Sequence, residues 1–366
     1  MKVRYSYLPQ QFADPDPILE EIRSVVMKGD FTLGARVEEF EEKFADLIGT
    51  RYAVGVNSGT DALMLSLKAL GVGHGDEVIT AANTFIATVG AINALGARPV
   101  FVDVTPYYTM DVSQVASAIT PRTKAVVPVH YTGEPVDMRP LIDVCEQHDL
   151  PIVEDACQSI LAEYEGKRAG TFGEAAGFSL HPLKNLNVWG DSGMIVTDSV
   201  DHARMLRLIR NHGMKSRDEI EILGYNSRLD TVQAVVGNAL VDQVPDITAS
   251  RIENASVYDA AFSSLEGIQL PPRRENVRQV YHLYVVYAQN RDELHTHLLE
   301  NGVSAKIHYP IPLFLQEGLS HLGYKPGDFP ETERQAGSII TLPVDQHLEP
   351  AQLHRVIEVV EAFYAR

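Results

Sequence analysis

Short apolar runs alternate with helix-forming stretches through the middle of the chain, between residues 51 and 197. The apolar runs are Tyr52–Val56, Glu77–Thr80, Pro99–Val102, Ala125–Val129, Pro151–Glu154, Ala175–Leu180 and Met194–Thr197. Helix-forming stretches lie between them at about 60–70, 84–95, 111–119 and 137–148. Alternation at this spacing is typical of βαβ units in a mostly parallel sheet. Because the runs are continuously apolar, we expect strands that are covered on both faces.

The pattern is helical on either side of this block. Before it, Val37, Phe40, Phe44, Leu47 and Ile48 share one helical face, and the helix is expected to end at Gly49. After it, two helices are predicted at Leu229–Val244 and Ile247–Leu265. Only Pro245 separates them, which predicts a kinked connecting arm.

The last third of the chain predicts a smaller α+β unit. It contains a strand at His282–Tyr287, a helix at about 291–301, a strand at Ala305–His308 and a terminal helix. The terminal helix carries an apolar stripe made of Leu353, Val356, Ile357, Val360, Phe363 and Tyr364. We therefore expect a large domain over residues 1–249 and a small domain over 250–366.

Charge and composition narrow the classes of function. The chain has 366 residues, of which 31 are basic and 49 acidic, so its net charge is −18. Such a surface repels a bare phosphate backbone and argues against a nucleic-acid partner, although local donors in a cleft still permit an anionic metabolite. The two cysteines, Cys145 and Cys157, form no disulfide framework. With no signal peptide and no long apolar run, we expect a soluble cytoplasmic protein without a membrane partner.

The first chemical signal lies at the start of a predicted helix. Ser58, Gly59 and Thr60 follow the first apolar run directly and open the helix at about 60–70. Free N–H groups and hydroxyls at a helix N-terminus suit a phosphate. An ordinary helix cap by Ser58 or Thr60 explains the same residues. The segment is neither a Walker loop nor GxGxxG, so it indicates no nucleoside triphosphate or dinucleotide site.

Two further signals follow apolar runs. Asp155 stands at the carboxyl end of a predicted strand, where open α/β sheets place their ligands, and could hold a protonated ring nitrogen. A strand-end aspartate that caps the next turn is an equal alternative. Lys184 lies past the next run, before the glycine-containing loop 189–193. A partly desolvated lysine there would be a good Schiff-base nucleophile, while a solvated lysine is the default.

These signals gain weight from their order along the chain. A phosphate cup, a strand-end carboxylate and a lysine after a strand are what pyridoxal phosphate requires for its phosphate, pyridine nitrogen and aldehyde. A fourth segment, GYNSRLD at 224–230, reads alone as a turn before a long helix. The set is therefore interpreted as a pyridoxal phosphate site.

The whole chain resembles the DegT–DnrJ–StrS family of sugar aminotransferases, which have the fold-type I, aspartate aminotransferase-like α/β architecture. The matching segments are GDFTLG (29–34), SGTDAL (58–63), GDEVIT (75–80), NTFIAT (83–88), PVHYTG (128–133), EDACQS (154–159), FSLHPLKNLNVWGDSG (178–193), GYNSRLDTVQA (224–234) and KIHYPIPLFLQ (306–316). The resemblance implies a large domain with a mostly parallel mixed sheet and a smaller C-terminal α+β domain.

The resemblance also implies a role for each matching residue. Lys184 would form the Schiff base with the cofactor aldehyde, and Asp155 would pair with the pyridine nitrogen. The other cofactor contacts would be Ser58, Gly59, Thr60 and Ser179 at the phosphate, Phe85 on the ring face and Gln158 near the ring hydroxyl. Asn226 would reach the phosphate of a neighbouring subunit's cofactor, which implies a homodimer. His308 and Tyr309 would line the sugar pocket, and we add Arg228 and Trp189 as candidates, the latter with simple packing as an equal alternative.

The implied reaction moves an amino group from L-glutamate to a keto group of a nucleotide-linked sugar, with pyridoxamine phosphate holding the nitrogen between the two halves. The product would serve surface polysaccharide, such as lipopolysaccharide O-antigen, or natural-product glycosylation. The runs at 309–316 and 323–333 favour a 3-keto sugar, whereas PVHYTG favours a 4-keto sugar, and a keto-inositol is a further alternative. A loop that usually reads GDGG or GEGG is Gly190-Asp191-Ser192-Gly193 here. We expect modest consequences unless Ser192 needs a positive φ.

Other classes of function fit the sequence less well. The sugar 3-dehydratases of the family carry histidine in place of Lys184. A regulatory protein of the same fold is a second class, and no basic stripe supports DNA binding. A Rossmann oxidoreductase lacks its glycine fingerprint. His295 and His297 point to different faces of a predicted helix, so no metal site is expected.

Overall fold

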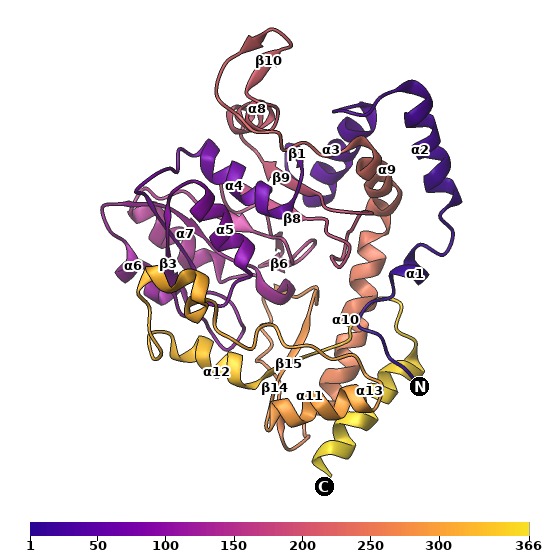
Figure 1. The fold of residues 1–366 in the computed structure, drawn as a ribbon. Helices are drawn as coiled ribbons and strands as arrows, with labels where there is room; N and C mark the ends of the chain where they lie inside the picture. The colour runs from indigo at the N-terminus through magenta and orange to yellow at the C-terminus, as the bar shows by residue number, and fades with distance from the viewer. Residues whose placement is uncertain (366) are drawn as a thin grey trace.

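The computed structural model describes residues 1–365, and a seven-stranded sheet forms its centre (Figure 1). In spatial order the strands are β3 (Arg98–Val102), β2 (Glu77–Ala81), β4 (Thr123–Val127), β5 (Val153–Asp155), β8 (Ala175–Ser179), β9 (Gly193–Thr197) and β1 (Tyr52–Val56). Parallel bridges Val126–Ile152 and Val129–Asp155 join β4 to β5. Only β9 runs antiparallel to its neighbours β8 and β1. The predicted α/β fold with a mostly parallel mixed sheet is therefore confirmed.

Helices cover both faces of this sheet, and every residue of β2 and β9 is buried. The helices before the connecting arm are α1 (Leu8–Gln11), α2 (Asp16–Lys28), α3 (Ala35–Ile48), α4 (Gly59–Ala69), α5 (Ile86–Ala94), α6 (Val115–Ala118), α7 (Met138–Gln147) and α8 (Val200–Ile209). As predicted, α3 buries Val37, Phe40, Phe44 and Ile48 and ends at Gly49, whose φ is 87°. The 111–119 stretch is shorter than expected, because a 3-10 turn (Val112–Gln114) precedes α6.

The connecting arm bends at a different place from the one predicted. It consists of α9 (Thr231–Leu240), a 3-10 turn (Val241–Gln243) and α10 (Val244–Phe262). Pro245 lies in the first turn of α10, where its missing N–H group leaves no hydrogen bond unmade. The prediction that Pro245 separates the two helices was wrong, since the break is the 3-10 turn before it.

A second lobe is built on a three-stranded antiparallel sheet. Its strands are β12 (Ile268–Gln269), β14 (Tyr284–Ala288) and β15 (Ile339–Leu342), packed against α10, α11 (Arg291–Glu300) and α13 (Pro350–Tyr364). In α13 the predicted stripe is buried from Leu353 to Val360. Val3 and Tyr7 from the chain start pack in the same core. The division after residue 249 stays a prediction, and α10 continues across it.

The predicted strand at Ala305–His308 was wrong. Its one ladder contact is the bridge between Lys306 and Thr341 of β15. Pro310 and Pro312 follow closely, and proline cannot donate to a strand ladder. The segment therefore leaves the sheet and carries its side chains toward the centre of the molecule.

The chain then folds back over β2 and β3. This return segment contains two 3-10 turns (Leu313–Leu315 and Glu317–Leu322) and α12 (Pro330–Ser338). Phe314 and Phe329 pack against Phe101 of β3. The carboxylate of Asp103 accepts hydrogen bonds from the N–H groups of Glu331 and Thr332, both 2.9 Å, at the first turn of α12. The second lobe is thus tied to the sheet on two sides.

Several small elements complete the fold. They are β6 (Glu163–Tyr164), β7 (Lys167–Arg168), β13 (Val277–Arg278), β10 (Met214–Ser216), β11 (Glu219–Ile220) and a 3-10 turn at Tyr131–Gly133. Strands of two or three residues leave no readable periodicity, so the sequence did not predict them. Among residues 1–365, no helix combines the length and apolarity needed to cross a bilayer.

Candidate active site

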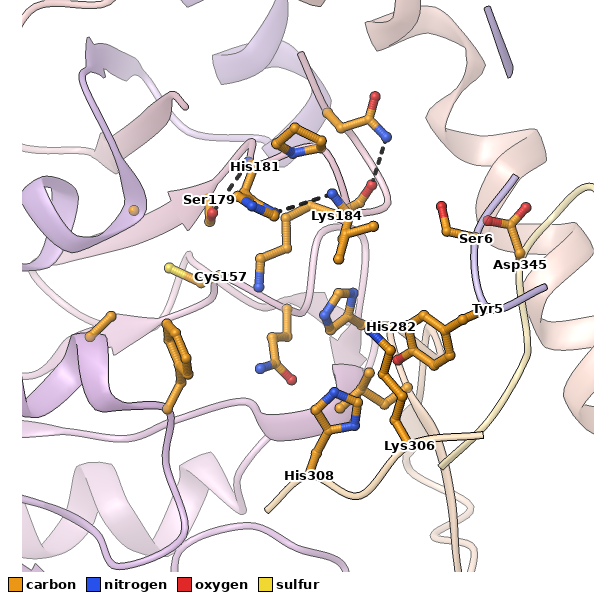
Figure 2. A pocket seen from close by; sticks show the side chains of 18 of the residues that line it. Tyr5, Ser6, Cys157, Ser179, His181, Lys184, His282, Lys306, His308 and Asp345 are labelled. Carbon is orange, nitrogen blue, oxygen red and sulfur yellow. Dashed lines mark hydrogen bonds between the residues drawn. The ribbon is translucent and has the colours of Figure 1, made fainter. Parts of the chain in front are cut away.

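A cavity of about 300 Å³ lies between the carboxyl ends of the central strands and the second lobe (Figure 2). Ser58, Gly59 and Thr60 line it from the start of α4. Asp155 and Ser179 line it from the ends of β5 and β8, and Lys184 lines it from the loop after β8. Gln158 and Phe85 also face it. The structure therefore brings together all eight residues that the sequence assigned to one subunit's cofactor.

The start of α4 keeps donors free for a ligand. Ser58 is the N-cap, and its Oγ accepts a 3.0 Å hydrogen bond from the N–H of Asp61. The expected helix cap is therefore real, but it uses neither the N–H groups of Gly59 and Thr60 nor the Thr60 hydroxyl. N–H groups in the first helical turn have no partner within the helix. With the Ser179 hydroxyl beside them, they form a site that suits a phosphate.

Two glycines let α4 approach the strand ends this closely. A Cβ on Gly59 would lie 2.7 Å from Ser179 Cβ and 3.0 Å from Cys157 Sγ. A Cβ on Gly193 would lie 2.3 Å from the carbonyl oxygen of Ser58. Side chains at either position would push the helix start away from β8 and β9. The glycines therefore hold the donors of α4 against the strand ends.

The Asp155 carboxylate is buried at the end of β5 and held from both oxygens. Thr88 Oγ1 in α5 donates a 2.7 Å hydrogen bond to Oδ2, and the Cys157 N–H donates a 3.2 Å bond to Oδ1. Thr88 is in turn 2.5 Å from Thr84 Oγ1. A carboxylate fixed in this way presents a defined direction to a ring nitrogen. This arrangement serves the cavity, whereas a turn cap alone would not need Thr88.

The preceding residue, Glu154, anchors the strand end behind the cavity. Its buried carboxylate accepts hydrogen bonds from the N–H groups of Gly170, Phe172 and Gly173 and from His130 Nε2 at 2.9 Å. The Val136 N–H donates to His130 Nδ1, so that ring carries its proton on Nε2. Burial pushes the pKa of Glu154 upward, but these donors outweigh it and hold that pKa below its ordinary value. The network fixes the backbone from which Asp155 projects.

Lys184 lies in the loop between β8 and β9 and points into the cavity (Figure 2). The Lys184 N–H donates a 2.8 Å hydrogen bond to the His181 carbonyl, and Asn187 Nδ2 donates a 3.1 Å hydrogen bond to the Lys184 carbonyl. These two bonds fix the backbone of Lys184. It forms no salt bridge with any of residues 1–365. Burial lowers its pKa, although the charges of Cys157 and Asp155 act in the opposite direction. A desolvated amine without a partner is the form in which lysine is nucleophilic.

Neighbouring groups complete this half of the cavity. Gln158 Oε1 accepts a 2.8 Å hydrogen bond from the Thr132 N–H, which leaves its amide NH₂ for a ligand. The Phe85 ring is 47% exposed, as expected for a face that a planar ligand would cover. Burial raises the pKa of Cys157 well above its ordinary range, so the thiol is not a thiolate nucleophile.

The opposite wall comes from segments that are far apart in the sequence. It includes Tyr5, His282, Lys306, His308 and Tyr309. His308 Nδ1 lies 2.9 Å from Thr341 Oγ1, and burial lowers the pKa of His308 to about 4. The placement of His308 and Tyr309 at the cavity agrees with their assignment to a sugar pocket. The sequence analysis missed Tyr5, His282 and Lys306, for which only the KIHY segment around Lys306 offered a signal.

Three of the predicted substrate or partner contacts do not line this cavity. The Trp189 ring packs edge-on against Phe12, with 5.5 Å between ring centroids and 81° between ring planes. In its own subunit Trp189 therefore packs, as the alternative expected, and its assignment to the sugar pocket stays a prediction. Arg228 Nη1 bonds Asn211 Oδ1 at 3.2 Å, and Asn226 is exposed. Neither side chain enters the cavity of its own subunit.

The serine in the loop 190–193 fits without strain. Ser192 does not adopt a positive φ, and its hydroxyl donates a 2.5 Å hydrogen bond to the Asp191 carbonyl. Serine in place of the usual glycine was expected to have modest consequences unless residue 192 needs a positive φ. It does not need one, so glycine's special backbone freedom is not required there.

The residues present fit pyridoxal phosphate. The glycine-lined start of α4 with Ser179 would hold the phosphate, Asp155 the ring nitrogen and Lys184 the aldehyde. Phe85 would contact the ring face, and Gln158 lies on the same side of the cavity.

Comparisons with known proteins show which family the chain matches. Residues 14–361 match the DegT/DnrJ/EryC1/StrS aminotransferase family. The "dTDP-3-amino-3,4,6-trideoxy-alpha-D-glucose transaminase" of Streptomyces venezuelae is 39% identical, over 97% of this chain and 96% of the relative. The "Pleiotropic regulatory protein" of Geobacillus stearothermophilus is 38% identical, over 100% of this chain and 99% of the relative.

Solved structures are similar over almost the whole chain. The crystal structure of S. venezuelae DesV in complex with a ketimine intermediate has a TM-score of 0.97 and 38% identity, covering 100% of this chain and 99% of that one. The pyridoxal phosphate form of a putative sugar aminotransferase, Spr1654 from Streptococcus pneumoniae, has a TM-score of 0.89 and 26% identity, covering 95% and 96%.

Proposed function

The chain belongs to the DegT/DnrJ/EryC1/StrS aminotransferase family, and we propose that it moves the amino group of L-glutamate to a keto group of a nucleotide-linked sugar. It is a pyridoxal phosphate-dependent transaminase with the fold-type I architecture. The observation that carries the proposal is the convergence of Lys184, Asp155 and the start of α4 on one cavity whose opposite wall carries His308 and Tyr309.

The chain's own residues have distinct parts in the reaction. When bound, pyridoxal phosphate supplies an aldehyde for the donor amine and a ring that withdraws electrons from the reacting carbon. Asp155, fixed by Thr88, would hold the ring nitrogen in its protonated form. The unpaired Lys184 amine takes a proton from one carbon and returns it to another in each half-reaction.

We infer that the amino group is added at C3 of the sugar. The name of the S. venezuelae relative places its amino group at C3, and the runs at 309–316 and 323–333 support the same position. The 4-keto sugars and keto-inositols are the alternatives to be tested. Lys184 opposes the dehydratase branch.

The proposal includes a homodimer. Asn226 and Arg228 lie outside the cavity of their own subunit, in the segment that the family resemblance assigns to a neighbour's cofactor phosphate. We place the enzyme in the cytoplasm, in amino sugar synthesis for surface polysaccharide or natural-product glycosylation. A regulatory activity is the alternative of another class, and the name of the G. stearothermophilus relative supports it.

One experiment tests the reaction and the sugar position together. Purified enzyme loaded with pyridoxal phosphate is incubated with L-glutamate and matched 3-keto and 4-keto nucleotide sugars, and products are identified by mass and NMR. We expect the yellow cofactor absorbance to bleach with glutamate alone and the 3-keto sugar to be aminated. Turnover of the 4-keto sugar alone would refute the C3 position, and no bleaching with any amino donor would refute the transaminase reaction.

A further inference from the structure

The wall of the cavity opposite Lys184 carries a cation that has no acidic partner. Lys306 Nζ lies 4.5 Å from the centre of the Tyr5 ring, within the range of a cation–π contact. It forms no salt bridge with any of residues 1–365. In Figure 2 its side chain runs from the second lobe toward Tyr5 and His282. The ammonium group is therefore held in position by an aromatic face and left without a counterion.

The carboxylates that line the cavity are engaged elsewhere or lie on another side. They are Asp155, Asp191 and Asp345. Asp155 accepts bonds from Thr88 and Cys157, and Asp191 belongs to the loop that touches the start of α4. Asp345 accepts bonds from the N–H groups of Tyr7 (3.2 Å) and His347 (3.0 Å). None of them neutralises Lys306.

The other cation on this wall already has an acidic partner. Arg251 is buried, lines the cavity and forms a salt bridge with Asp345, with 3.9 Å between Nη2 and Oδ2. Its other contacts are neutral oxygens, namely Gln346 Oε1 at 3.0 Å and the Tyr281 carbonyl at 3.1 Å. The positive charge that this wall leaves without an acidic partner is therefore that of Lys306. Because low-dielectric walls focus the field of a charge into a cleft, an anionic group is attracted to Lys306.

The two imidazoles between the lysines stay neutral. The pKa of His308 is lowered to about 4 by burial first and then by the charges of Lys306 and Lys184, so this ring lies under the influence of both ammonium groups. Burial together with Lys184, Arg251, His308 and His181 lowers the pKa of His282 as well. Neither ring supplies charge at neutral pH, and Lys306 is the accessible cation of this wall.

We propose that Lys306 binds the distal carboxylate of the amino donor and so selects a dicarboxylic amino acid over neutral ones. This inference rests on the proposed transaminase function and names the residue that sets its donor preference. Lys184 marks the reacting end of the donor, and Lys306 comes from the opposite lobe to meet the other end. A charge-assisted hydrogen bond to a carboxylate is lost when the donor's distal group is a neutral amide.

The test compares L-glutamate with its amide isostere L-glutamine in the donor half-reaction. The rate of each single turnover is measured by the bleaching of the cofactor absorbance. Wild-type enzyme should prefer glutamate, and Lys306→Met should reduce the glutamate-to-glutamine ratio by at least about tenfold. Lys306→Arg should keep most of the preference. Lys325→Met, which removes an exposed lysine outside the cavity, is the matched control and should change nothing.

Equilibrium binding gives a readout that does not depend on turnover. Glutarate, a dicarboxylate without an amino group, is titrated by calorimetry into the holoenzyme, and its Kd should rise at least about tenfold in Lys306→Met. An unchanged ratio and an unchanged glutarate Kd would overturn the proposal. If Lys306→Met lost activity only in the ketosugar half-reaction, the proposal would also be overturned. Lys306 would then bind the diphosphate or another anionic group of the sugar nucleotide.

The result separates this inference from the transaminase reaction itself. If wild-type enzyme bleaches with amino donors but Lys306→Met retains the glutamate preference, only the role of Lys306 is wrong. If no donor bleaches the wild type, the proposed function fails and the donor site fails with it.

Discussion

Thr88 Oγ1 donates a 2.7 Å hydrogen bond to Asp155 Oδ2, and this bond joins helix α5 to the end of strand β5. It fixes the plane of the carboxylate that we propose pairs with the cofactor ring nitrogen. Thr84 lies 2.5 Å from the same hydroxyl, so the bond is the last member of a short chain. The direction in which Asp155 points is therefore set by a helix rather than by its own strand.

Thr88→Val should lower kcat by about tenfold, the effect of losing one hydrogen bond to a charged group, and leave KM for glutamate nearly unchanged. Valine has the same shape, so the thermal midpoint should change little. Stopped-flow bleaching by glutamate measures the step directly. An unaltered rate would show that Asp155 keeps its orientation without Thr88.

Lys184→Ala should abolish turnover, with a loss of at least about 10²–10⁴-fold, because we propose that this residue supplies both the amine and the proton transfer. The absorbance of lysine-bound cofactor should vanish while the circular dichroism spectrum is kept. Lys325→Ala serves as the control. A near-normal rate in Lys184→Ala would defeat the central assignment.

Lys184→Met should raise the free energy of unfolding of the cofactor-free protein at neutral pH. Burial lowers the pKa of Lys184, so the folded state disfavours the charged form that the unfolded state prefers. This destabilisation is complete below the lowered folded pKa and is lost as pH rises to the unfolded value near 10.5. The stability gain should thus be modest at pH 7 and disappear near pH 10.5, measured by denaturant melts at both pH values. A gain that grows with pH would contradict this account.

Glu154→Gln should destabilise the fold by about 2–4 kcal/mol, since the glutamine NH₂ group would face N–H donors inside the protein. The pKa of Glu154 is held below 4.5 in the folded state, so its contribution is present above about pH 4.5 and lost as pH falls through the lowered pKa. The wild type should therefore lose more stability than the variant on acidification. Urea unfolding at pH 7 and at a series of pH values below 4.5 compares the two proteins, and an equal loss in the free energy of unfolding would contradict the assignment.

Gly193→Ala should weaken cofactor binding by about tenfold or more, because the new Cβ would meet the Ser58 carbonyl at 2.3 Å and displace the start of α4. Gly73→Ala is the control, since a Cβ there meets no heavy atom within 4 Å. Fluorescence titration with pyridoxal phosphate gives both affinities. Equal affinities would show that the helix start tolerates the displacement.

The cofactor half of the site could be predicted because its signals are local. Ser58, Asp155 and Lys184 each follow an apolar strand, and strand ends meet at one edge of a sheet whatever lies beyond it. The central strands could also be predicted from a local signal, because buried strands are continuously apolar. Pro245 misled the prediction because proline also fits the first turn of a helix.

The opposite wall could not be predicted from local pattern. Tyr5, Arg251, His282 and Lys306 come from separate elements that only tertiary packing brings together. The segment at Lys306 looks like a strand in sequence, yet one bridge to Thr341 is all that it forms. Trp189 illustrates the converse, because a residue beside the reactive loop packs against Phe12 instead.

A parallel bridge joins Val3 to Val303 and holds the chain start beside the segment at Lys306. The N-terminal segment and the segment at Lys306 form one wall, while the cofactor's residues belong to the central sheet and its helices. Mutations in that wall leave Glu154, Thr88 and the start of α4 untouched. Substitutions in residues 5–10 and 307–312 would therefore change the wall of the cavity that faces the substrate and leave the contacts of Asp155 with Thr88 and Cys157 in place.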